Sequence, residues 1–138
     1  MNEQLNEHYT IPLPPVTKKN SAQVVHTGQK CPVCKRGKNV RLLPSKQYRK
    51  YEEAALWCLQ RKEPIDTPVN VKCLFYMPTA RKVDLTNLLE AADDALVTAG
   101  VLADDNSKIV VSHDGSRVLL DRDKPRTEIY ITEVQNEL

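Results

Sequence analysis

The stretch VNVKCLFYMPTARKVDLTNLLEAADDALVTAGVLADDNSKIVVSH, residues 69–113, decides the fold of this chain. Apolar side chains recur at every second residue from Val69 to Met77, which is the period of a half-buried strand. A helix is predicted next, with Asp84 as its N-cap and Gly100 as its C-terminal stop. Another strand is predicted over 107–113. This order of strand, helix and strand indicates a sheet with a helix packed on it.

The predicted helix has an apolar and a polar side. At 100° per residue its apolar side chains share one arc, formed by Leu85, Leu88, Leu89, Ala92, Ala95, Leu96 and Ala99. The polar side chains form a stripe elsewhere, consisting of Asn87, Glu90, Asp94 and, at the helix entrance, Asp84. Thr86 and Asp93 lie outside both sets. We therefore expect the apolar arc to face the core and the polar stripe to remain accessible.

The flanking residues supply the other predicted elements. These are a strand at 9–13 that ends at Pro14-Pro15, two arms of a ribbon at 23–25 and 39–43, a helix from an N-cap at Ser45 to about Lys62, and a last strand at 127–134. The segment DGSRVLLDRDKP, residues 114–125, is expected to be a polar turn region. Together these elements predict one α+β domain over residues 1–138, with a mixed sheet packed against two main helices.

The composition excludes several classes of protein. A chain of 138 residues with 41% hydrophobic residues fits one small globular domain. It has no apolar run near the roughly 18 residues that cross a bilayer, and its start lacks the layout of a secretory signal. We therefore expect a soluble, cytoplasmic protein without a membrane partner. Its four cysteines are too few for a disulfide scaffold, so they are expected to be thiols or metal ligands.

The charges are segregated along the chain, although the net charge is only +2. Residues 16–50 contain ten Lys and Arg and no Asp or Glu, whereas residues 84–106 contain six Asp and Glu and no Lys or Arg. A basic segment suits a polyanion such as nucleic acid, and an acidic segment suits hard divalent cations. The alternative is that both segments are solvated surface.

Three segments carry a resemblance to a known family. RKVDLTNLLEAADDALVTAGVLADDNSKIVV (81–111), PLPPVTKKN (12–20) and RTEIYITEV (126–134) together resemble the RusA family of Holliday junction resolvases. The resemblance implies a RusA-like fold and a homodimer of phage or prophage type. It also implies an endonuclease that hydrolyses four-way DNA junctions with Mg²⁺, or with Mn²⁺ as a substitute, in DNA recombination and repair.

The resemblance also implies site residues. Asp84 and Asp105 match the first and last essential carboxylates, with Asp104 beside Asp105 as a further metal ligand. Asn87 and Asp94 match supporting positions of the motif. Two residues depart from it: Thr86 replaces the middle catalytic aspartate, and Glu90 replaces a lysine and would add a carboxylate to the metal site. These departures leave open a second function, a protein that binds branched DNA with impaired catalysis.

Residue types alone allow structural roles for the same aspartates, an N-cap for Asp84 and turn positions for Asp104 and Asp105. Fifteen helical residues span about 22 Å, so Asp84 and Asp105 meet only if the chain folds back or an assembly joins them. The resemblance implies that the loop after the helix returns toward its start or toward the partner subunit.

Basic residues in two places are candidate DNA ligands. Lys18, Lys19 and Asn20 in the loop TKKNS match the PP-x-x-x-N region of the family and could contact phosphates. On the first predicted helix, the basic residues Lys46, Arg49 and Lys50 could extend that track. The alternative for each is a solvated side chain.

The loop insertion at about 26–41 contains Cys31-Pro-Val-Cys34, which has the spacing of a zinc knuckle. A structural Zn²⁺ needs four ligands, and the chain has no second C-x-x-C. The remaining ligands would come from His26, Cys58 or Cys73, or from a second copy of the loop in a dimer. We expect Cys58 and Cys73 instead to be buried hydrophobes. His113, in the sequence HDG, is interpreted as a turn residue.

Overall fold

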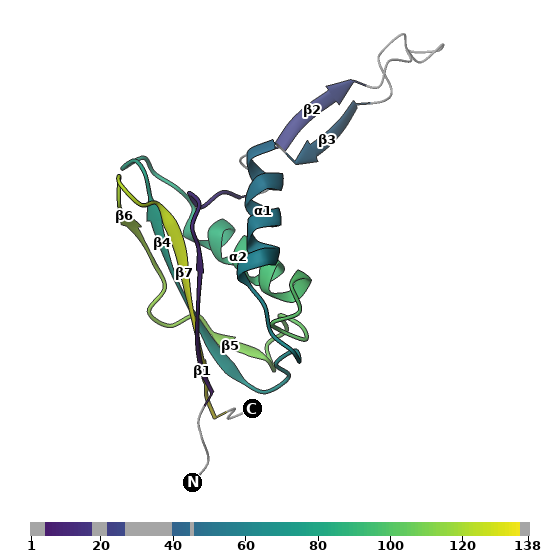
Figure 1. The fold of residues 1–138 in the computed structure, drawn as a ribbon, viewed down its shortest axis with the longest axis vertical. Coiled ribbons are helices and arrows are strands. Elements are labelled where there is room, and N and C mark those ends of the chain that lie inside the picture. Colours follow the sequence, from purple (N-terminus) through teal and green to yellow (C-terminus); the bar gives the residue numbers. More distant parts are fainter. Residues whose placement is uncertain (1–4, 18–21, 27–39, 45, 136–138) are drawn as a thin grey trace.

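The computed structural model describes residues 5–17, 22–26, 40–44 and 46–135 (Figure 1). Its elements in chain order are β1 (Asn6–Ile11), β2 (Ala22–His26), β3 (Val40–Pro44), α1 (Lys46–Cys58), β4 (Val69–Met77), α2 (Leu85–Thr98), β5 (Val110–Ser112), β6 (Arg117–Leu120) and β7 (Arg126–Glu133). The main sheet has five strands in the order β1-β7-β4-β5, and β6 also pairs with β4. The predicted α+β fold with a mixed sheet and two helices is confirmed.

Strand β4 is the centre of the sheet and has the predicted bounds. It pairs antiparallel with β7, from Val69 opposite Glu133 to Tyr76 opposite Arg126. On its other edge it pairs in parallel with β5 and then with β6. The alternation read from the sequence is the alternation of burial, since Val69, Val71 and Cys73 are each fully buried. One face of β4 therefore supplies the middle of the core.

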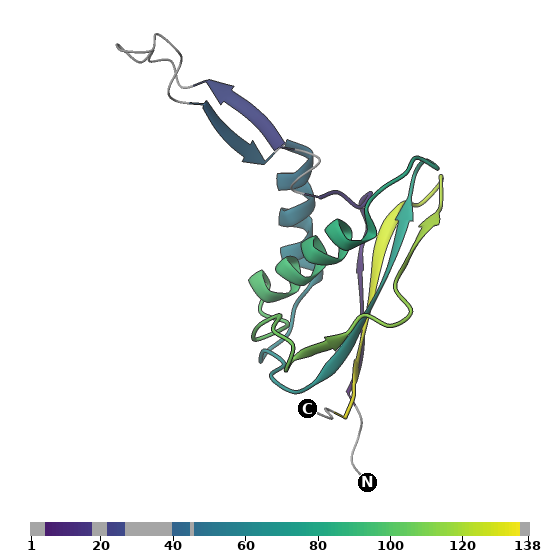
Figure 2. The ribbon, with the colours of Figure 1, turned by 180° about the vertical axis from the view of Figure 1, so that it is seen from behind.

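Both helices lie on the same side of the main sheet (Figures 1 and 2). Their apolar faces pack with the sheet into one cluster that includes Leu59 from the end of α1, Leu96 from α2, and Phe75 and Ile129 from the sheet. On α1, Tyr51 is buried, and its hydroxyl forms a 3.0 Å hydrogen bond with the hydroxyl of Thr127 on β7. This bond fixes α1 to the sheet.

Helix α2 begins and ends as its sequence predicts. Asp84 is the N-cap, and Gly100 follows the C-cap with a φ of 82°, a conformation that glycine adopts without strain. The predicted apolar arc faces the core: Leu88, Ala92 and Leu96 are buried, and the other members pack against the core at partial exposure. The helix therefore presents its opposite side to solvent.

The loop after α2 is fixed by backbone pairing with the segment before β4. The amide of Ile65 donates to the carbonyl of Val101 at 2.8 Å, and the amide of Ala103 donates to the carbonyl of Ile65 at 2.9 Å. Val101 and Leu102 are buried. These contacts set where the aspartates that follow, at 104 and 105, leave the core.

The predicted ribbon is confirmed in its backbone. Strand β2 pairs antiparallel with β3, from Ala22 opposite Pro44 to His26 opposite Val40. The two strands project from the N-terminal end of α1, away from the main sheet (Figure 1). Residues 27–39, which contain most of the predicted insertion with Cys31 and Cys34, lie outside the described residues, as does the predicted N-cap Ser45.

Four predicted boundaries were wrong. The first strand, expected over 9–13, is β1 at Asn6–Ile11, because its pairing with β7 begins at Asn6 opposite Thr132. The expected turn region 114–125 contains β6, because its apolar centre pairs with the free edge of β4. The strand expected over 107–113 is limited to β5, because the Asn106 side chain accepts the Lys108 amide at 2.9 Å and holds a turn there. Helix α1 ends at Cys58, four residues before the expected Lys62. No described helix is long and apolar enough to cross a membrane.

Candidate active site

Asp84 marks the entrance of α2, where its carboxylate has the structural role that residue types alone predicted. Its Oδ1 accepts hydrogen bonds from the amide of Thr86 at 3.1 Å and from the Thr86 hydroxyl at 2.6 Å. Thr86 is one of the two residues that depart from the motif of the resemblance. Its hydroxyl donates a hydrogen bond to the Asp84 carboxylate, so Thr86 adds no negative charge to the helix entrance.

Beyond this entrance the polar stripe runs along the accessible side of α2. Asn87 is half-buried, and Glu90 and Asp94 are exposed. A rise of 1.5 Å per residue places Asp94 about 15 Å along the helix from Asp84. The stripe thus links the helix entrance to a second acidic region near the C-terminal end of α2.

That second region is a cavity of about 250 Å³ between α1 and α2. Its lining consists of Tyr48, Glu52, Asp94, Val97, Thr98 and Asp105. Asp105 and Asp94 were predicted site residues, whereas Glu52 was missed. Glu52 lies on the predicted first helix and belongs to no motif. Only the packing of α1 beside α2 brings its carboxylate to those of Asp94 and Asp105. The structure thus gathers three carboxylates from three segments around one cavity.

Tyr48 is one of the residues that line this acidic cavity. It is buried, and its pKa is raised, first by burial and then by the negative charges of Glu52 and Asp94. The phenol therefore remains protonated at neutral pH. The carboxylates of Glu52, Asp94 and Asp105 gather negative charge around the cavity, which favours cations.

The loop after α2 returns only part of the way along the helix. Asp105 lies beside the last turns of α2, next to Val97 and Thr98, and Asp84 lies at the opposite end. Among the described residues, no three His, Cys, Asp or Glu side chains come together as a group that could hold a metal ion. One chain on its own therefore does not join the two predicted essential aspartates.

Asp104 fills the turn position that its residue type suggests. Its Oδ1 accepts the Asp105 amide at 2.8 Å, and its Oδ2 accepts the Asn106 side-chain amide at 3.0 Å. The Asn106 hydrogen bond, followed by that of the Asp105 amide, lowers the pKa of Asp104 below its usual value. Asp104 is therefore ionised, and it orders the turn that presents Asp105.

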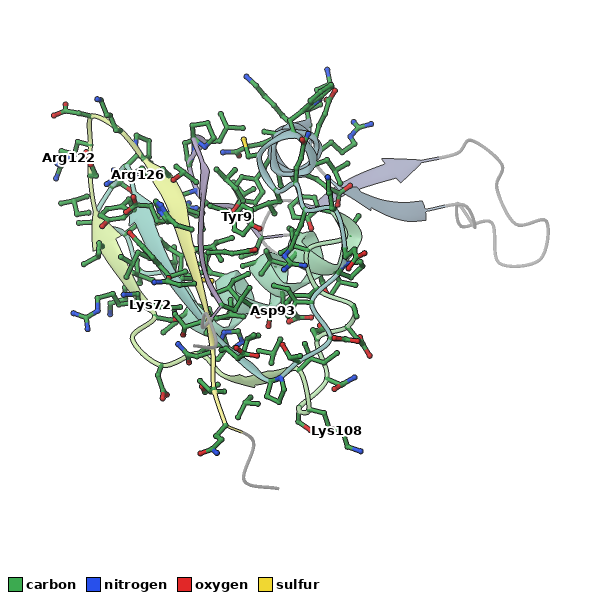
Figure 3. All side chains as sticks on the ribbon, turned by 60° about the horizontal axis from the view of Figure 1, so that its bottom comes forward. Tyr9, Lys72, Asp93, Lys108, Arg122 and Arg126 are labelled. Atoms are coloured by element: carbon green, nitrogen blue, oxygen red, sulfur yellow. The ribbon has the colours of Figure 1, made fainter. Side chains whose placement is uncertain are left out.

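Asp93, which the helical periodicity assigned to neither the apolar arc nor the polar stripe, is the only charged side chain that is buried among the described residues. Its Oδ2 lies 2.9 Å from Nε2 of His113, and Nδ1 of His113 lies 2.9 Å from the carbonyl oxygen of Val71. Figure 3 shows Asp93 in the interior, between α2 and the sheet. Because both ring nitrogens face acceptors, His113 donates at both when it is protonated.

The pair is structural, and the turn predicted at His113 also forms, since the carbonyl of His113 accepts the Ser116 amide at 3.1 Å. The hydrogen bond to Asp93 is the main cause that raises the pKa of His113 above its usual value. The other carboxylate oxygen of Asp93, Oδ1, is buried without a hydrogen-bond partner among the described residues. No local pattern signals this pair, because its members are 20 residues apart.

The predicted DNA ligands divide into two groups. Lys46, Arg49 and Lys50 are exposed on α1, away from the buried side of the helix. Lys18, Lys19 and Asn20 lie outside the described residues. The three basic side chains of α1 thus lie on the same helix as Glu52 of the acidic cavity.

The two cysteines among the described residues, Cys58 and Cys73, are both free thiols, but only Cys73 is buried as expected. Cys73 is fully buried on β4, and burial raises its pKa, so it remains a neutral thiol. Cys58 was expected to be buried as well, but it is half-buried, because α1 ends there and leaves its side chain partly accessible. Neither residue belongs to a metal-binding group of the described chain.

Comparison with protein families gives a match over most of the chain. The model of the family described as Endodeoxyribonuclease RusA matches residues 12–132, which is most of the chain and includes α2 with both groups of carboxylates. Comparison with curated proteins gives no match. The matched span, the mixed α+β sheet and the acidic helix agree with one another, and the chain belongs to the RusA family of endodeoxyribonucleases.

Proposed function

We propose that this member of the family is a Holliday junction resolvase, an enzyme that cuts four-way DNA junctions and acts in recombination and repair. The observation that carries the proposal is the family match over residues 12–132, which covers the acidic helix, the cavity and the basic side of α1. A phage or prophage setting, inferred from the sequence resemblance, is part of the same proposal.

We propose Mg²⁺ as the cofactor, with Mn²⁺ as a substitute. The donor set supports this choice, since Asp84, Asp94 and Asp105 offer only oxygen ligands, which Mg²⁺ prefers. One described chain does not fit the ion by itself, because no three such groups come together. Bound Mg²⁺ would polarise the phosphoryl group and activate a water molecule.

A homodimer would supply two active sites, and it would allow carboxylates of two chains to come together. Two symmetric cuts in a four-way junction need two sites, which a two-fold dimer supplies. A partner subunit can also bring its own acidic region to the helix entrance at Asp84, which lies far from Asp105 in the same chain. We therefore include the homodimer in the proposed function.

The protein's own residues have separable tasks in this proposal. Asp105 and Asp94, with Glu52, provide the negative potential that collects divalent cations at the cavity. Asp104 holds the turn that carries Asp105. Exposed Lys46, Arg49 and Lys50 would contact phosphates and orient the DNA without reading its sequence. Lys18, Lys19 and Asn20 are proposed for the same task.

A cleavage assay on a synthetic four-way junction tests the proposal. Purified protein should nick the junction with Mg²⁺ and fail to do so with a chelator. Asp84→Asn and Asp105→Asn should both abolish nicking, and Asp66→Asn, an exposed aspartate outside α2 and the cavity, should have no effect. Equal nicking with the chelator present would refute the metal requirement.

Thr86 favours one second candidate function, a protein that binds branched DNA with impaired catalysis. The Thr86 hydroxyl donates a 2.6 Å hydrogen bond to Asp84. The motif of the resemblance has an aspartate in place of Thr86. If this function holds, the wild type binds the junction without cutting it, and Thr86→Asp gains Mg²⁺-dependent cleavage. Efficient cleavage by the wild type would exclude this candidate.

A further inference from the structure

Trp57 is the most unusual exposed side chain of the described surface. It is the chain's single tryptophan, and it is 75% exposed on α1. Exposure of a large aromatic ring to water is unfavourable, so such a ring on a helix surface often marks a contact. The carboxylate cavity does not use it, since Trp57 is not among the residues that line it.

The neighbours of Trp57 identify the kind of partner. At 100° per residue, Lys46, Lys50 and Trp57 fall within about 40° of one another, on the solvent-exposed side of α1. Glu53 is the acidic member of this stripe. Charged residues are depleted in the cores of protein interfaces, which argues against a protein partner here. Lysines in line with an exposed aromatic ring are instead typical of surfaces that bind unpaired nucleic-acid strands.

We propose that Trp57 stacks on an unpaired or unstacked base at the branch point of the DNA, while Lys46 and Lys50 hold adjacent phosphates. The inference rests on the proposed function, because it requires branched DNA as the ligand. Lys46 and Trp57 are eleven residues apart, so the stripe extends about 16 Å along the helix and can follow a strand over several nucleotides.

The stripe is separate from the carboxylates. Glu52, which lines the cavity, lies about 140° around α1 from Trp57. A change at Trp57 therefore leaves the acidic cavity untouched. Leu56 provides a matched control, because it is also a large apolar side chain on α1, 43% exposed, but it points about 100° away from the stripe.

Fluorescence tests the contact directly, because the emission of the protein comes from one tryptophan. The titration uses wild-type protein without divalent ions, so that DNA is bound and not cut. The probes are a four-way junction, the same junction with unpaired bases at its centre, and a duplex. Stacking should lower the emission and protect it from iodide quenching with both junctions, and more strongly with the unpaired bases.

Affinity measurements with labelled DNA complete the test. Trp57→Ala should weaken junction binding roughly tenfold, the range for loss of one stacked base, while Trp57→Phe and Leu56→Ala should stay near the wild type. Unchanged emission in a complex that does form would overturn the stacking proposal and leave the proposed function intact. Emission that changes with protein concentration alone would overturn it in favour of a second copy of the chain. Absence of junction binding by the wild type would refute both proposals.

Discussion

Asp93 and Asp94 are neighbours on α2, yet they lie in opposite environments. Asp93 points into the protein and pairs with His113 at 2.9 Å, whereas Asp94 is exposed and lines the acidic cavity with Asp105. A turn of 100° between consecutive residues separates the two. One short acidic sequence thus supplies both a buried ion pair and a residue of the accessible cavity, and charge alone does not distinguish the two aspartates.

The largest expected effect on stability is at Asp93, the buried one of the two aspartates. Asp93→Asn should lower the free energy of unfolding by about 2 kcal/mol, because it leaves His113 without its charged partner in a partly buried place. Asp94→Asn should change it by less than about 0.5 kcal/mol, as is usual for surface substitutions. Urea unfolding of both variants measures the difference, and equal losses would abolish the distinction between the two aspartates.

The sequence predicted those parts of the fold that depend on local patterns. Alternation located β4, and a cap, an apolar arc and a glycine located α2. Strand β6 was missed because its signal is a parallel pairing with a distant edge. The burial of Asp93 was not predicted for the same reason, since its partner His113 lies outside α2.

The candidate site divides in the same way. Asp94 and Asp105 were recognised through the family motif, and both line the cavity. Glu52 was not recognised, because a glutamate on a surface helix has no signal until α1 packs beside α2. The distance between Asp84 and Asp105 could not be predicted either, since it depends on the path of the loop after α2.

A smaller effect on stability is expected at the hydrogen bond between Tyr51 of α1 and Thr127 of β7. Tyr51→Phe should lower the free energy of unfolding by about 1 kcal/mol, because the buried hydroxyl of Thr127 loses its 3.0 Å partner. Thermal unfolding measures the first change, and a Tyr51→Phe protein as stable as the wild type would show that this bond does not hold α1.

Loss of the N-cap at the start of α2 should lower the stability by a similar amount. Asp84→Ala removes the acceptor for the Thr86 amide and hydroxyl, so we expect a loss of about 1 kcal/mol in stability. Asp84→Asn keeps an N-capping oxygen and should lose much less. Chemical unfolding of the two variants therefore separates the capping role of Asp84 from its charge, and identical losses would contradict the capping role.

The pH dependence of the ion pair is the subtlest expected effect. The pKa of His113 is raised in the folded state, so protonation stabilises the fold. This contribution is fully present below the unfolded-state pKa of about 6.5 and disappears as the pH rises through the higher folded-state pKa. The stability difference between wild type and His113→Asn should therefore shrink as the pH rises above about 6.5. A difference that stays constant with pH would contradict a protonated pair.

The most direct test of the account compares junction cleavage by Asp105→Asn and Asp93→Asn under single-turnover conditions with Mg²⁺, at a temperature where both remain folded. The account predicts that Asp105→Asn loses cleavage by roughly 100-fold or more at wild-type stability, while Asp93→Asn is less stable but still cuts. Full cleavage by Asp105→Asn would contradict the assignment of the exposed carboxylates to the chemistry of this endodeoxyribonuclease.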